Sequence, residues 1–175
     1  PDTPAGLPRW RSGANLALMG DRFIENNQSG LEVSSGDAIV VQGCEATNNH
    51  GKGLAIGGIA AGASVSVTGC VVRGNWENGI QLGLNGEAAA LAVTGNTVVS
   101  NTGHAVYVEY AEGGGLPAVA DNCYAGNSGW NGVLAAGAIG VTMTWPAVYP
   151  EPLAAAGLAV NDGAELAVEP GASMR

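Results

Sequence analysis

The chain has 175 residues, a formal net charge of −9, and only 12% charged and 5% aromatic residues. Its length fits one domain, and low charge combined with 46% hydrophobic residues argues against disorder. The excess of acidic groups would repel nucleic-acid phosphates and anionic lipids, so we expect no nucleic-acid partner. We also expect no membrane insertion, because Gly, Ser or Thr interrupts each long uncharged stretch.

A repeat of 23 to 26 residues begins near residue 14 and is marked by one Asn in each unit. Each unit reads as a strand, a Gly turn, a short second strand, an Asn turn and a third strand. The anchors follow one another at spacings of 23, 26, 26 and 26 residues: Asn26, Asn49, Asn75, Asn101 and Asn127.

Aliphatic residues recur at fixed distances from each anchor. Eight residues before it lie Leu18, Val41, Val67, Val93 and Val119. Aliphatic residues also stand five and seven positions after the first four anchors. This period of two is what one face of a strand requires. One extra residue around Trp130 and Asn131 shifts these positions in the fifth unit to Val133 and Ala135.

Small residues stand four positions after the first four anchors, at Gly30, Gly53, Gly79 and Ala105. We expect a turn there that needs a small or a left-handed residue.

These features predict an all-β fold, a parallel β-helix whose regular rungs span about residues 14 to 139. No stretch of a dozen residues has helical spacing free of Gly. Residues of one type that recur once per unit suit rungs stacked about 4.8 Å apart. The five anchors would then form a ladder in which each side-chain amide bonds to the next. The alternative is that Asn stands in these turns only because it tolerates a left-handed backbone.

The unit from Leu91 to Asn101, which reads LAVTGNTVVSN, resembles the right-handed parallel β-helix repeats of the pectate-lyase-like superfamily. The resemblance covers residues 14 to 139 and implies the fold. It implies little about activity, because that superfamily includes lyases, glycosidases, epimerases, adhesins and inert spacers.

The last part of the chain predicts a Pro-rich connection at residues 145–152 and the start of further rungs at residues 153–175. The segments 145–149 and 163–172 are similar to a segment of large bacterial extracellular β-helix proteins, where it closes one array of rungs and opens the next. We therefore expect residues 1–175 to be one β-helix domain of a larger protein that is secreted or lies on the cell surface.

The outward positions of the third strands are where enzymes of this fold place their chemistry. They are Glu32, Ala55, Gln81 and Tyr107, followed by Ser34, Gly57, Gly83 and Glu109. No cluster of carboxylates appears there, and we expect no metal and no cofactor. Arg73 and Lys52 fall on different faces, and the alignment places no carboxylate beside either of them.

The densest set of ionisable groups is His104, Tyr107, Glu109 and Tyr110. A His with a Tyr could remove and return the C5 proton of a sugar. The alternative is that His104 is an exposed turn residue, and that Tyr107 and Tyr110 offer flat surfaces to sugar rings or to a partner chain.

The three cysteines do not form a metal-binding pattern. Cys44 and Cys70 occupy one column of the repeat, so we predict that they are buried neighbours on adjacent rungs and remain reduced. Cys123 lies one position away and leaves an odd thiol.

Two functions fit these observations. The first is a structural or adhesive β-helix module with no catalytic activity of its own. The second is a carbohydrate-active domain: a polysaccharide lyase, an epimerase or a glycan-binding module. The partners we expect are a polysaccharide or another copy of a β-helix chain.

Overall fold

The computed structural model describes residues 9–11, 15–34, 37–88 and 90–172, and every regular element within them is a β-strand. Residue 14, where the rungs were predicted to begin, and residues 173–175 of the predicted last rungs lie outside the described residues. Within the described part of the chain, no helix is long and apolar enough to cross a membrane.

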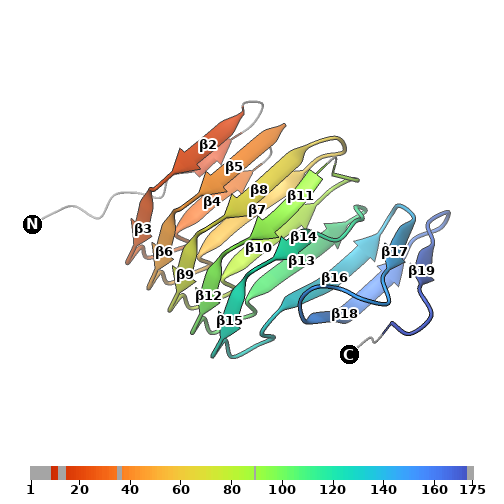
Figure 1. The fold of residues 1–175 in the computed structure, drawn as a ribbon. Helices are drawn as coiled ribbons and strands as arrows, with labels where there is room; N and C mark the ends of the chain where they lie inside the picture. Colours follow the sequence, from red (N-terminus) through yellow and green to blue (C-terminus); the bar gives the residue numbers. More distant parts are fainter. Residues whose placement is uncertain (1–8, 12–14, 35–36, 89, 173–175) are drawn as a thin grey trace, which may run out of the picture.

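The strands form three parallel sheets, and within each sheet the equivalent strands of successive rungs lie side by side (Figure 1). Sheet A contains β1 (Arg9–Arg11), β4 (Leu31–Ser34), β7 (Leu54–Ile59), β10 (Ile80–Leu84), β13 (Val106–Ala111), β16 (Val133–Ile139) and β18 (Leu153–Val160). Sheet B contains β2 (Leu16–Met19), β5 (Ala38–Gln42), β8 (Ser64–Thr68), β11 (Ala90–Thr94) and β14 (Ala118–Ala120). Sheet C contains β3 (Arg22–Ile24), β6 (Glu45–Thr47), β9 (Val71–Arg73), β12 (Thr97–Val99) and β15 (Cys123–Ala125).

A fourth, two-stranded sheet pairs β17 (Met143–Trp145) with β19 (Leu166–Val168). The segment between β17 and β18 bonds to residues that flank the last strands of sheets B and C. Tyr149 Oη donates to the carbonyl of Pro117, and Glu151 accepts from Asn122. The chain therefore folds back over the end of these two sheets before β18 continues sheet A.

Each repeat position pairs with the same position of the next rung. Val41 pairs with Val67 and Val67 with Val93 in sheet B, and Leu54 pairs with Ile80 in sheet A. The parallel β-helix predicted from the spacing is confirmed, including the shift in the fifth unit, where Val106 pairs with Val133 and Val108 with Ala135.

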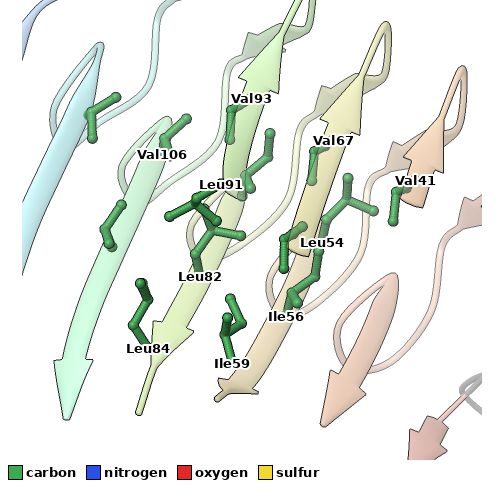
Figure 2. Packing of buried hydrophobic residues seen from close by; sticks show 14 of the residues in the cluster. Val41, Leu54, Ile56, Ile59, Val67, Leu82, Leu84, Leu91, Val93 and Val106 are labelled. Carbon is green, nitrogen blue, oxygen red and sulfur yellow. The ribbon is translucent and has the colours of Figure 1, made fainter. Parts of the chain in front are cut away.

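The core is a set of aliphatic columns between the three sheets (Figure 2). The side chains of Leu54, Ile80, Leu82, Val67 and Val93 have no exposed surface. Full burial of one such side chain stabilises a fold by about 1.5–3 kcal/mol, so repetition in every rung provides most of the driving force for stacking.

A left-handed residue directly precedes each anchor Asn. The φ angles are 55° at Glu25, 55° at Asn48, 64° at Gly74, 57° at Ser100 and 63° at Gly126. None of the five anchors has a positive φ. The explanation that these Asn residues are present because they tolerate a left-handed backbone is therefore wrong.

The glycines four positions after the first three anchors allow a close approach that a Cβ would block, and the fourth unit has Ala105 there. Gly53 has no positive φ, and a Cβ there would lie 2.8 Å from Nδ2 of Asn75 and 2.6 Å from the carbonyl oxygen of Gly79. Of the two predicted requirements, small size is correct and left-handed geometry is wrong.

Candidate functional site

The outer face of sheet A carries a groove of about 410 Å³. Side chains of β4, β7, β10 and β13 line it, at the outward positions predicted from the strand alternation. Its floor is low because β7 and β10 place Ala55, Gly57 and Gly83 there. A bulge at Gly57 and Gly58, where Gly58 has a φ of 64°, shifts the register and places Ile59 opposite Leu84.

A chain of hydrogen bonds fixes the polar side chains of the groove. Asn78 Nδ2 donates to Gln81 Oε1 at 3.1 Å, and Gln81 Nε2 donates to Glu109 Oε2 at 3.0 Å. Across the groove, Ser29 Oγ donates to Glu32 Oε1 at 3.2 Å. These bonds hold two acidic side chains and one amide at outward positions, where they face solvent or a ligand.

Lys52 also lines the groove and is paired with an acid. Its Nζ lies 3.4 Å from Glu77 Oε2. The expectation that no carboxylate lies near Lys52 is therefore wrong, because the turn places Glu77 of the next rung beside it.

His104 bonds to the rungs on both sides. Its backbone N–H donates to Asn78 Oδ1 at 2.9 Å, and its Nδ1 accepts the backbone N–H of Trp130 at 2.8 Å. Burial lowers the pKa of His104, and its half-buried ring stacks on Tyr107 with centroids 5.8 Å apart. Because Nδ1 accepts a hydrogen bond, the neutral ring carries its proton on Nε2. His104 is neither an exposed turn residue nor a base with a free Nδ1.

The two tyrosines of the candidate set point in opposite directions. Tyr107 lies half-buried on the outer face, where burial and the charge of Glu109 raise its pKa. Tyr110 is 2% exposed, and its hydroxyl donates to the Gly115 carbonyl at 2.7 Å. The idea that Tyr110 offers a surface to sugar rings is wrong. Alternation from Val106 and Val108 places Tyr110 in the core, and that signal was present in the sequence.

Arg73 lies on the outer face of sheet C, whereas Glu109 lies on sheet A and His104 in the turn before β13. Its Nη2 is 3.7 Å from Glu45 Oε1, while Arg22 Nε donates to Glu45 Oε2 at 2.9 Å. The hydrogen bond from Arg22 is the main reason that the pKa of Glu45 is lowered. The alignment therefore missed a carboxylate near Arg73, because Glu45 lies diagonally across the strand pair.

The predicted Asn ladder is confirmed. Each side-chain Nδ2 donates to Oδ1 of the next anchor at 2.8–2.9 Å, and the same Oδ1 accepts the backbone N–H of the preceding anchor at 3.0 Å. The second proton of Nδ2 goes to a core-strand carbonyl, such as that of Ala46 for Asn75. Asn49, Asn75 and Asn101 are at most 1% exposed.

A second ladder, which the sequence analysis missed, runs through the turn between sheets B and C. Asn96 Oδ1 accepts the Cys70 N–H at 2.9 Å, and Asn96 Nδ2 donates to Asn122 Oδ1 at 2.9 Å. Asn122 donates in turn to Glu151. The signal available in the sequence was an Asn at the same repeat position of two successive units, Asn96 and Asn122. In the structure a left-handed residue precedes each of them, Gly95 and Asp121.

Cys44 and Cys70 occupy this same column in earlier rungs. Both are 1% exposed and free, as predicted, and Cys123 is exposed. Burial raises the pKa of the Cys70 thiol to about 11. Cys70 Sγ contacts the carbonyl of Val41, the counterpart of the bond from Asn96 Nδ2 to Val67. The thiol of Cys70 thus takes the place of the Nδ2 donor of an Asn side chain, but it provides no counterpart of the Oδ1 acceptor.

Metal ligation has no candidate among residues 9–11, 15–34, 37–88 and 90–172: no group of three or more His, Cys, Asp or Glu there could hold an ion.

Comparison with protein families found one match to this architecture. The model of the right-handed β-helix region matches residues 9–144, which is most of the chain. Comparison with curated proteins and with solved structures found no match.

Proposed function

Because the chain belongs to the right-handed β-helix family, we propose that it is a structural or adhesive module of a secreted or cell-surface bacterial protein. The observation that carries this proposal is the use of turn side chains to join rungs. The amides of Asn75 and Asn96 and the imidazole of His104 all bond to neighbouring rungs. Polar groups engaged in this way stiffen the stack, which suits a rigid spacer or display surface.

The arrangement of the candidate catalytic groups also supports a module without turnover. A C5 epimerase or lyase needs a base and a charge stabiliser that converge on one sugar. Here Nδ1 of His104 accepts a backbone N–H, and Arg73 lies on sheet C while Glu109 lies on sheet A.

The test is incubation with pectate, alginate and chondroitin, with and without Ca²⁺. We expect no rise in unsaturated-uronate absorbance and no C5 inversion by NMR. Activity that disappears in His104→Ala or Tyr107→Phe would overturn the proposal and support the enzyme alternative.

The groove of sheet A favours a second candidate function, the binding of a glycan along the outside of the stack. Its small-residue floor leaves room for a chain that crosses β7 and β10, and Gln81 and Glu109 offer fixed hydrogen-bonding groups beside it. The net charge of −9 favours a neutral glycan over an acidic one.

A glycan array tests this second function. We expect binding of neutral glycans that weakens in Gln81→Ala. The matched control is Ser66→Ala, an outward substitution on sheet B, which should leave binding unchanged. Equal binding by both variants, or no binding by the native chain, would contradict the groove assignment.

A further inference from the structure

A second pocket, of about 270 Å³, lies where the segment after β17 folds back toward Trp130. It concentrates aromatic groups: Trp130, Trp145 and Tyr149 line it, and they are three of only nine Phe, Tyr and Trp residues in the chain. Pro146 and Pro152 extend the apolar wall, and Glu151 provides a carboxylate. This pocket shares no lining residue with the groove of sheet A, so the inference below does not rest on the function proposed above.

Hydrogen bonds to the backbone hold two of the rings in place. Trp130 Nε1 donates to the Pro152 carbonyl at 3.4 Å, and Tyr149 Oη donates to the Pro117 carbonyl. Trp145 is 1% exposed, so it packs in the core beneath the pocket and supports the wall rather than offering a face to a ligand. With these donors engaged, the partly exposed rings of Trp130 and Tyr149 offer a ligand their π-systems, and little side-chain entropy is lost on binding.

The carboxylate of Glu151 offers charge, and most of its acceptor positions are already engaged. Its Oε1 accepts the backbone N–H of Asn122 at 3.0 Å and Asn122 Nδ2 at 2.8 Å. Its Oε2 lies 3.0 Å from the same Nδ2 and accepts the hydroxyl of Tyr124. Asn122 Nδ2 gives one of its two protons to the Val93 carbonyl, so its contacts with Oε1 and Oε2 share the other. Three protons therefore engage the carboxylate, and about one of its four lone-pair positions remains open.

We propose that this pocket binds a quaternary ammonium group. Aromatic faces attract a cation placed over them, and a nearby carboxylate adds an opposite charge. A primary ammonium would bring three N–H donors, of which Glu151 has room to accept about one, whereas a quaternary ammonium has no N–H to satisfy. Its methyl groups also suit the proline and aromatic wall.

The first test compares ligands on the native chain by isothermal titration calorimetry. Choline should bind at least ~10-fold more tightly than 3,3-dimethylbutan-1-ol, which has the same shape without charge, because cation–π attraction is lost. Ethanolamine, which carries a primary ammonium, should also bind more weakly than choline. Equal binding of choline and the neutral alcohol, or no binding of choline, would overturn the proposal.

Phosphocholine and Nε-trimethyllysine then distinguish the sources of the group. Both carry the same trimethylammonium head, but the phosphate of phosphocholine would lie near Glu151 and be repelled. Tighter binding of trimethyllysine indicates a modified protein as the source, and tighter binding of phosphocholine indicates a lipid headgroup. Weaker binding of both than of 3,3-dimethylbutan-1-ol counts against the site.

Two variants locate the site. Trp130→Leu keeps apolar volume but removes a ring, and Glu151→Gln removes the charge while keeping an oxygen for Asn122. Both should weaken choline binding, while Trp76→Leu, which removes an exposed ring from a distant turn, should not. Far-UV circular dichroism checks the fold of each variant. If Trp130→Leu is folded and binds choline like the native chain, the assignment is wrong.

Discussion

Asn131 Oδ1 accepts both the backbone N–H and the side-chain Nδ2 of Asn127, at 3.0 and 2.9 Å, although the two residues lie only four positions apart. In every earlier rung these donors reach the anchor of the next rung, 23 or 26 residues later. The extra residue of the fifth unit therefore lets the chain close its own ladder.

This closure predicts an unusual cost at an exposed position. Asn131→Ala should lower the free energy of unfolding by about 1–2 kcal/mol, because two donors of the buried Asn127 lose their acceptor and water replaces it only in part. Asn131→Asp keeps an acceptor and should lose much less. Urea unfolding measures both. Asn161→Ala, at another exposed Asn, is the control, and an equal loss there would contradict the closure.

Replacement of Asn75 by Leu should destabilise the fold more severely. Asn75 Oδ1 accepts two hydrogen bonds from Asn49, and its Nδ2 donates to Asn101 and to Ala46. Loss of this side chain leaves buried groups unsatisfied at a cost of about 3 kcal/mol or more. A melting temperature equal to that of the native chain would show that the Asn ladder does not stabilise the fold.

The column of the two cysteines predicts a gain instead. Asn96 Oδ1 accepts the backbone N–H of Cys70, which lies one rung earlier. In Cys70→Asn the new Oδ1 would accept the backbone N–H of Cys44 in the same way. The new Nδ2 would take over the contact of Cys70 Sγ with the carbonyl of Val41. We expect stabilisation of about 1 kcal/mol by urea unfolding. Cys70→Ala, which adds no acceptor, should destabilise, and equal effects of the two variants would refute the argument.

Stability should fall as the pH rises from 9 toward 11. Burial raises the pKa of Cys70 from 9.0 to about 11, so in this window the unfolded chain releases a proton that the folded chain retains. The unfolded state then binds fewer protons, and the free energy of unfolding decreases with pH. Burial also raises the pKa of Tyr110 and Tyr149, which extends the decrease.

Urea unfolding at about pH 8 and about pH 10.5 measures this decrease. Cys70→Ala removes one of the titrating groups, so its stability should depend less steeply on pH than that of the native chain. An identical slope would show that Cys70 does not contribute.

The sequence predicted the stack because each rung repeats the same contacts. Val67 must suit Val41 and Val93 above and below it, and a one-dimensional pattern records that constraint directly. The left-handed residues before the anchors were less visible, because Glu25, Asn48 and Ser100 share no side-chain chemistry and only their backbone is alike.

The end of the second ladder and the aromatic pocket could not be predicted in the same way. Both depend on Glu151, which reaches Asn122 across 29 positions from a segment that does not repeat. The partner of Arg73 was missed because salt bridges on a sheet can run diagonally between strands, whereas an alignment compares only equivalent positions.

The amides of the first ladder all point the same way. From Asn26 to Asn101 each Nδ2 donates to the anchor of the next rung, so the side-chain dipoles add head to tail and polarise one another. The ladder therefore has a dipole along the stack, and at its C-terminal end the N–H groups of the last Asn need an acceptor. A group that closes this end must be a hydrogen-bond acceptor, and both ladders obey this requirement, one with Asn131 and the other with the anionic Glu151. A Lys or Arg in place of Asn131 or Glu151 would bring N–H donors toward N–H donors, and the last Asn of the ladder would have no acceptor.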